Sequence, residues 1–133
     1  MKLLKRTLEI ACFNLESALM AEKAGAHRIE LCEDYNSGGV TPKLEIMIQA
    51  KKNISIPIHV MIRPRGGNFR YSFDEFNAMK RSISLCRENK NDGIVFGILN
   101  EKNGIDLERC AEIVDLSKPM NVIFHRAFDE CKQ

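Results

Sequence analysis

Charged and titratable side chains interrupt three runs that are otherwise typical of buried β-strands. Glu9 stands in the run LEIACF, Glu30 in RIELC and His59 in IPIHVMI. A buried charge costs several kcal/mol unless it is paired, so each of these residues needs either a partner or a function. Because strand side chains alternate between faces, we expect Glu30 and Cys32 to share a face. Cys12 should point away from the face of Glu9.

Basic side chains follow the third and the fifth of these runs. Arg63 and Arg65 stand in RPRGG, and His125 and Arg126 open HRAFD. Guanidinium groups are fork-shaped donors that suit carboxylates and phosphates, and a nearby Glu or His can serve as acid or base. The glycine pair of RPRGG would let backbone N–H groups approach a ligand. These residues predict an anion-recognising or proton-transferring site, with Glu30 and His125 as the candidate catalytic groups.

A purely structural interpretation of the same residues is also open. The acidic and basic groups of neighbouring strands could neutralise one another, fix the strand register and fill the interior of the barrel. His59 by itself is more typical of a hydrogen-bonded core histidine than of a ligand. Both interpretations require that these strands direct their polar side chains into a common cavity.

The elements that must position these residues alternate regularly along the chain. Short β-branched runs alternate with segments of helical periodicity, which gives the order β-α-β-α-β-α-β-α-β. Asn14 is expected to cap the first helix, and Thr41 with Pro42 to start the second. Ser72 and Glu75 form a capping box for the third helix. The fifth strand is expected to continue from residues 121–124 into His125 and Arg126.

Two architectures satisfy this order, a doubly wound open sheet and part of a (β/α)₈ barrel. The candidate functional residues follow strands two, three and five, as they would at the C-terminal rim of a barrel. An open sheet would gather them at one switch point, and no GxGxxG or Walker-type loop follows the first strand. The sequence therefore favours an α/β partial barrel of five strands and four helices, expected to form a single domain over residues 1–133.

Composition narrows the classes of function. The 133 residues carry a net charge of +2, with charges of both signs interspersed, which is unlike the basic surface of a nucleic-acid binder. No apolar stretch is long enough for a signal peptide or a membrane span, so a cytoplasmic protein is expected. Five scattered cysteines without a CxxC pair predict reduced thiols rather than disulfides or a zinc site.

Five motifs together resemble the CutC family, which is named for copper homeostasis. They are LEIAC, RIELC, GGVTP, IRPRGG and HRAFD, in the order and spacing of the family. The resemblance implies a (β/α)₈ barrel and a cytoplasmic protein linked to copper handling. It also implies a pocket built by Glu9, Glu30, Arg63, Arg65, His125, Arg126 and Asp129.

The chain is shorter than the family's barrel, which is roughly 200 to 250 residues long. The last three strands are missing, so the first and fifth strands would be unpaired edges and the apolar interior would be exposed. A truncated product, a fragment, or a chain completed by association, such as a homo-oligomer, would each explain this length.

Two ligand classes follow from these observations. Copper(I) prefers thiolate and thioether ligands, and Cys12 and Cys32 match cysteines of the family pattern on neighbouring strands. A bend at the end of strand one would be needed to bring them together, because their parities differ. The alternative is an enzyme or binder for a phosphorylated or carboxylated small molecule that uses the Glu, Arg and His residues. A purely structural interaction module has little support beyond the exposed edges.

Overall fold

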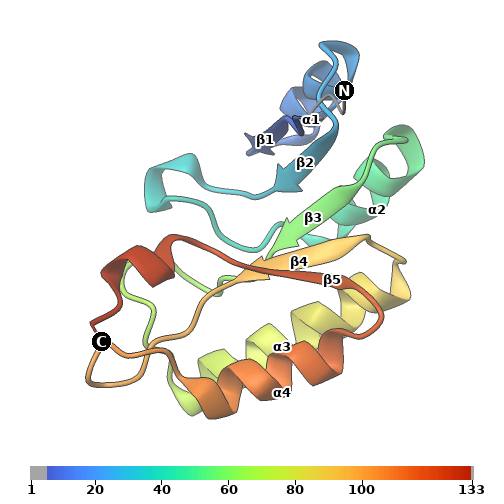
Figure 1. Cartoon of the computed structure of the whole chain (residues 1–133). Coiled ribbons are helices and arrows are strands. Elements are labelled where there is room, and N and C mark those ends of the chain that lie inside the picture. The colour runs from blue at the N-terminus through green and yellow to red at the C-terminus, as the bar shows by residue number, and fades with distance from the viewer. Residues whose placement is uncertain (1–5, 133) are drawn as a thin grey trace, which may run out of the picture.

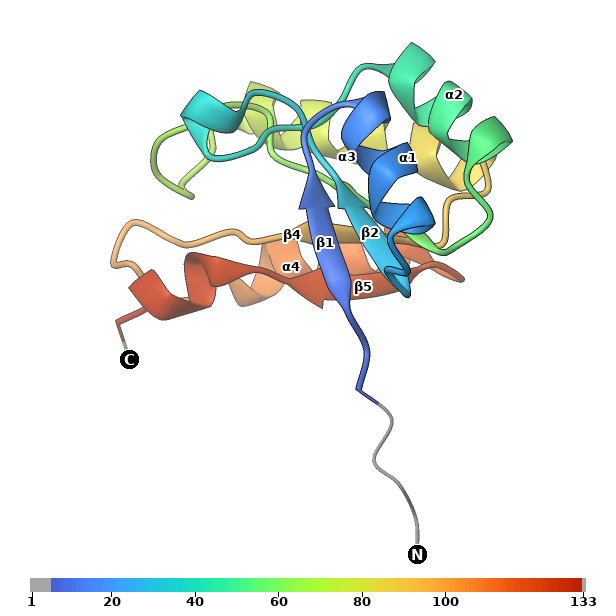
Figure 2. The same ribbon diagram turned by 90° about the horizontal axis from the view of Figure 1, so that it is seen from above.

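The computed structural model describes residues 6–132 and places five short strands in one parallel sheet (Figures 1 and 2). The strands are β1 (Glu9–Cys12), β2 (Arg28–Leu31), β3 (Ile58–Met61), β4 (Gly93–Phe96) and β5 (Asn121–Phe124), paired in chain order. The helices are α1 (Leu15–Lys23), α2 (Leu44–Asn53), α3 (Phe73–Glu88) and α4 (Leu107–Ser117). Short 3₁₀ helices, η1 (Tyr35–Ser37) and η2 (Arg126–Glu130), lie after β2 and β5. The predicted element order is confirmed.

Local hydrogen bonds explain where three of the helices begin. The side chains of Asn14, Ser72 and Asp106 each accept a hydrogen bond from the backbone N–H three residues further on. Glu75 completes the capping box by accepting from the backbone N–H of Ser72 at 2.8 Å. These contacts satisfy N–H groups that the helix itself leaves free, so the predicted starts of α1 and α3 are confirmed.

The second helix does not begin where the sequence pattern indicated. The N-cap of α2 is Lys43, and Thr41 lies outside the helix. The Thr41 hydroxyl instead accepts from the backbone N–H of Arg63 at 2.8 Å and donates to the Arg63 carbonyl at 3.2 Å. Thr41 therefore joins the loop after β2 to the end of β3. Its hydroxyl is engaged by Arg63 and is not free to cap the helix, which explains why the predicted start is wrong.

The fifth strand is shorter than predicted. β5 ends at Phe124, and His125 is the N-cap of η2 rather than a strand residue. The His125 side chain accepts from the backbone N–H of Ala127 at 3.1 Å, which turns the chain at this point. The basic residues after β5 therefore lie at the start of a short helix.

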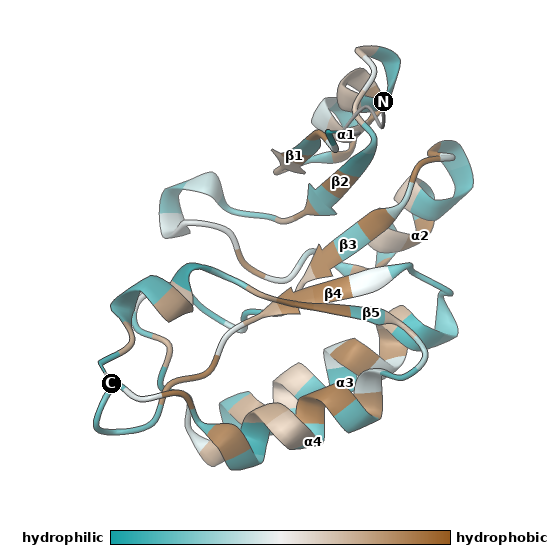
Figure 3. Ribbon diagram, in the orientation of Figure 1, coloured by the Kyte–Doolittle hydropathy of each residue, from teal (hydrophilic) through white to brown (hydrophobic). Residues whose placement is uncertain are grey.

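The main core lies between the sheet and the helices. It includes Ile29, Leu31, Ile58, Val60, Ile94 and Phe96 from the strands, and Ala18, Met47, Phe76, Met79, Ile83 and Ile113 from the helices. Every residue of β3 and β4 is buried, as expected for central parallel strands, and Figure 3 shows that the helices alternate polar and apolar residues. None of the helices within residues 6–132 is long and apolar enough to cross a membrane.

The opposite, concave face of the sheet carries the polar strand residues. Glu30 lies opposite Ala11 on β1 and His59 on β3, so the three side chains share this face. A smaller apolar cluster of Cys32, Met61 and Val95 covers the same face nearer the carboxyl ends of the strands. The predicted alternation is thus confirmed.

Candidate functional site

A cavity of about 330 Å³ opens on the concave face at the carboxyl ends of the strands. Gly38 contributes backbone to the lining. The apolar side chains of the lining are those of Ala11, Phe13, Met61, Phe69, Val95 and Ile123. Its polar lining comprises Glu30, Cys32, Arg63, His125 and Arg126. Glu30, Arg63, His125 and Arg126 are therefore brought together here, as a shared site requires, whereas Arg65 does not line the cavity.

Arg63 is the most deeply buried charge of the cavity, with 3% of its surface exposed. Its Nη1 donates to the carbonyl oxygens of Ser37 and Gly39 at 2.9 and 3.2 Å. Its Nη2 donates to the Gly67 carbonyl at 2.8 Å, and the guanidinium lies 5.1 Å from the Phe69 ring centre. Carbonyl dipoles hold the group but do not neutralise it, so its positive charge remains available to a ligand.

Arg126 directs its guanidinium toward the same space as Arg63. A Cβ on Gly38 would lie 3.0 Å from Nη2 of Arg126 and 3.2 Å from Nη1 of Arg63. Gly38 also has a φ of +84°, which side chains rarely adopt. Glycine is therefore favoured at this position for two reasons. It allows the backbone turn, and it leaves room for the two guanidinium groups to converge.

His125 presents a neutral imidazole to the cavity. Its Nδ1 accepts the Ala127 N–H, so the proton of the neutral ring is assigned to Nε2, which is buried without a partner among residues 6–132. Burial, and then the charges of Arg63 and Arg126, lower the pKa of His125 to about 4. Near neutral pH His125 is thus suited to donate a hydrogen bond, and poorly suited to the role of base.

Glu30 supplies the only carboxylate among the lining residues of the cavity. The Cys32 thiol lies 3.6 Å from its Oε1, and no basic side chain within residues 6–132 forms an ion pair with it. Burial, and then the charge of Glu9, raise the pKa of Glu30. Burial and the adjacent Glu30 also raise the pKa of the Cys32 thiol, which keeps the sulfur protonated.

Glu9 belongs to a separate cluster nearer the amino ends of the strands. Its Oε2 lies 2.5 Å from Nε of Arg28 and 3.5 Å from Nδ1 of His59. His59 is 3% exposed, and burial lowers its pKa. Glu9 is therefore paired within the protein and does not line the cavity, which is the arrangement that the structural interpretation predicts.

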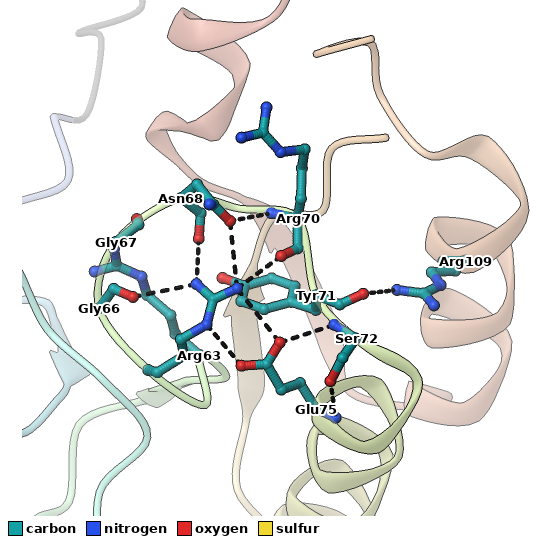
Figure 4. A network of polar contacts seen from close by, with 10 residues as sticks. Arg63, Gly66, Gly67, Asn68, Arg70, Tyr71, Ser72, Glu75 and Arg109 are labelled. Atoms are coloured by element: carbon teal, nitrogen blue, oxygen red, sulfur yellow. Dashed lines mark hydrogen bonds and ion pairs between the residues drawn. The ribbon is translucent and has the colours of Figure 1, made fainter. Parts of the chain in front are cut away.

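Arg65 turns away from the cavity because the chain does not stay extended past Pro64. Its Nε lies 2.6 Å from Oε2 of Glu75, and it donates to the carbonyl oxygens of Asn68 and Arg70 at 2.8 and 2.7 Å. Figure 4 shows Glu75 facing this loop at the start of α3. Arg65 thus fixes the shape of the loop whose neighbouring residues line the site.

Comparison with known proteins identifies the family. Residues 6–133 match the sequence profile of the CutC family. The chain belongs to the CutC family. It is 51% identical over 124 residues to the CutC family protein of Proteus mirabilis, and 47% identical over 126 residues to that of Erwinia tasmaniensis. These alignments cover 93% and 95% of this chain but 50% of each relative, so the chain spans about half the length of the curated relatives it matches.

Solved structures show what larger fold this CutC-family chain resembles. The CutC protein of Streptococcus agalactiae, provisionally named a copper homeostasis protein, matches with a TM-score of 0.89 and 34% identity, over 96% of this chain and 62% of that one. The phosphoenolpyruvate phosphomutase of Streptomyces platensis matches with a TM-score of 0.54 at 12% identity, over 98% of this chain and 47% of that one. The second likeness concerns the fold alone. The five strands and four helices thus correspond to part of a barrel, as predicted.

The two cysteines of the CutC pattern lie on opposite faces of the sheet. Cys12 is buried in the core between sheet and helices, whereas Cys32 packs in the concave cluster. No group of three or more His, Cys, Asp or Glu side chains that could hold a metal occurs within residues 6–132. Cys12 and Cys32 therefore pack in different clusters, and a copper(I) site made by this pair stays a prediction.

Asp129, which the CutC resemblance placed in the pocket, lies in η2 outside the main cavity. It is exposed and lines a shallower hollow together with Ile105, Phe124 and Phe128. His125 and Arg126 border both hollows, so Asp129 adjoins the site without lining it.

Phe69 and Gly38 are parts of the site that reasoning from sequence did not single out. Phe69 is 2% exposed, and its ring lies 5.0 Å from the ring of His125 and 5.8 Å from the guanidinium of Arg126. Neither residue is charged, so the search for charges inside strands missed both. For Gly38 the available signal was the glycine pair of the GGVTP motif.

Proposed function

We propose that this chain binds a small anionic molecule, with a phosphate or carboxylate group, in the cavity at the strand ends. The observation that carries the proposal is the convergence of Arg63 and Arg126 on the space beside Gly38. Arg63 is buried with only carbonyl partners, so an anion placed there would supply the missing negative charge. His125 would add a hydrogen bond from Nε2, and charge-assisted bonds of this kind are the strong ones.

Proton transfer at this site is assigned to Glu30 rather than to His125. Glu30 lines the cavity, and a carboxyl group with a raised pKa is better suited to hold and deliver a proton than an ordinary one. The imidazole cannot accept a proton at Nδ1 without losing the bond from Ala127, and the two guanidinium groups oppose a second positive charge. If the CutC-type site is catalytic, Glu30 is therefore its acid–base residue and His125 its anion donor.

Titration with inorganic phosphate tests the anion site. Arg126→Met should weaken binding by tenfold or more, because hydrogen bonds to charged groups are worth about 1.5–3 kcal/mol each. Arg126 is exposed, so its loss should leave the fold intact. Arg81→Met on α3 removes the same charge away from the cavity and is the control. Equal phosphate affinity in the two variants, or no binding by the unmodified chain, would refute the proposal.

Copper(I) is the second candidate ligand, on one specific observation. Cys32 packs with Met61 in the cavity, which places a thiol and a thioether on the same face. Cys32→Ser should then abolish copper(I) binding measured by competition with a chromogenic chelator, whereas Cys12→Ser should preserve it. Unchanged affinity in Cys32→Ser would eliminate this candidate, and a loss in both variants would point to the cysteine pair instead.

A further inference from the structure

We propose that the ligand of this cavity carries an ammonium group in addition to its anionic group, and that Glu30 binds the ammonium. This inference rests on the proposed anion site and names the class of molecule that the site would take. It concerns the inner part of the cavity, which the anion itself would not fill.

The basis of the inference is the contrast between two carboxylates on the concave face. Glu9 has the guanidinium of Arg28 at 2.5 Å. Glu30 lines the cavity, and its one hydrogen-bonding contact within residues 6–132 is the weak thiol donor of Cys32 at 3.6 Å. Burial and the charge of Glu9 both oppose its ionisation. A cation brought by the ligand would reverse both effects.

The layout of the cavity separates the two charged ends by a short distance. The Cys32 sulfur lies 3.6 Å from Oε1 of Glu30, so it adjoins the carboxylate end of the cavity. The Cys32 sulfur lies 3.5 Å from where a Cβ on Gly39 would be, and the Gly39 carbonyl accepts from Arg63. The Cys32 sulfur therefore adjoins both the Glu30 carboxylate and the loop whose carbonyl oxygens hold Arg63. Because one side chain adjoins both ends, we infer a ligand with a short spacer of about two or three carbons between its charges.

The wall between the two ends is apolar. Met61, Val95 and Ile123 line the cavity there and offer no side-chain hydrogen-bond partner to the middle of a ligand except the weakly accepting Met61 sulfur. A hydroxyl at the inner end would satisfy one lone pair of Glu30 but leave its charge uncompensated. An ammonium group compensates the charge and donates as well, so it is the group that this arrangement selects.

Matched phosphate esters test this inference by isothermal titration of the 133-residue chain. The probes are 2-aminoethyl phosphate, 2-hydroxyethyl phosphate and ethyl phosphate, which share an anionic group and differ only at the far end. We expect the amino ester to bind at least tenfold more tightly than ethyl phosphate. Glu30→Gln should reduce that preference below twofold, because an amide cannot compensate the charge of the ammonium group.

The outcomes separate this inference from the proposed anion site. If ethyl or hydroxyethyl phosphate binds as tightly as the amino ester, the ammonium site is overturned and the anion site stands. If no phosphate ester binds to the folded chain, both are overturned. If Glu30→Gln fails to fold, as judged by circular dichroism, the comparison of probes on the unmodified chain decides, and Glu30→Asp replaces it as the variant that should narrow the preference.

Discussion

Gly38→Ala is the most direct perturbation of the proposed anion site, because it adds one methyl group between the two guanidinium groups. The new Cβ would lie 3.0 Å from Arg126 and 3.2 Å from Arg63, closer than carbon and nitrogen normally approach. Arg63 is held by three carbonyl oxygens and cannot retreat, so Arg126 must move. We expect phosphate affinity to fall about threefold to tenfold, or roughly 0.7–1.4 kcal/mol.

Gly25→Ala is the matched control, because it shares the backbone effect without the contacts. Gly25 has a φ of +99°, and nothing lies within 4 Å of the Cβ that alanine would add. A side chain at such a φ costs roughly 1–2 kcal/mol, so both variants should lose that much stability in urea unfolding followed by circular dichroism. Only Gly38→Ala should lose phosphate affinity. Equal affinities in the two variants would refute the convergence of Arg63 and Arg126 on this space.

Three further perturbations test the surroundings of the site. Arg63→Met should lower the free energy of unfolding by about 2–4 kcal/mol, because three carbonyl oxygens lose their donor; a loss below 1 kcal/mol in urea would contradict this. The pKa of His125 is about 4 in the folded chain against roughly 6.5 when unfolded, so the unfolded chain binds more protons between these values. Stability should therefore fall as the pH drops from about 6.5 toward 4, by up to about 3 kcal/mol, and His125→Gln should remove most of that slope. Ser72→Ala should cost about 1 kcal/mol through loss of the α3 cap, and an unchanged urea midpoint would argue against it.

The sheet and the faces of its strands could be predicted because they depend on short-range patterns. Alternation along β2 places Glu30 and Cys32 on one face, and the opposite parity of Cys12 places it in the helix-side core. The capping contacts of Asn14 and Ser72 also involve residues only three positions away. The register then follows from packing one apolar face of the sheet against the helices.

Residues beyond the strand ends could not be placed in this way. Whether Arg65 faced the cavity depended on the chain staying extended past Pro64, and its ion pair with Glu75, ten residues away, decides otherwise. The Thr-Pro pattern likewise predicts a helix start at Thr41, although its hydroxyl bonds to the backbone of Arg63. Both outcomes depend on contacts beyond the local pattern, between a loop and the start of α3 for Arg65 and between a loop and the end of β3 for Thr41.

The structural and the functional interpretation of the interior charges each apply to different residues. Glu9 and Arg28 neutralise each other nearer the amino ends of the strands, so their burial needs no ligand. Glu30 and Arg63 lie on the same concave side but remain apart, one held by a thiol and the other by carbonyl oxygens. Neighbouring strands that can pair one set of opposite charges could equally pair a second, and pairing would relieve the desolvation of both groups. The absence of an ion pair between Glu30 and Arg63, which line one cavity, is therefore what the proposed ligand would account for and the stability of the sheet does not.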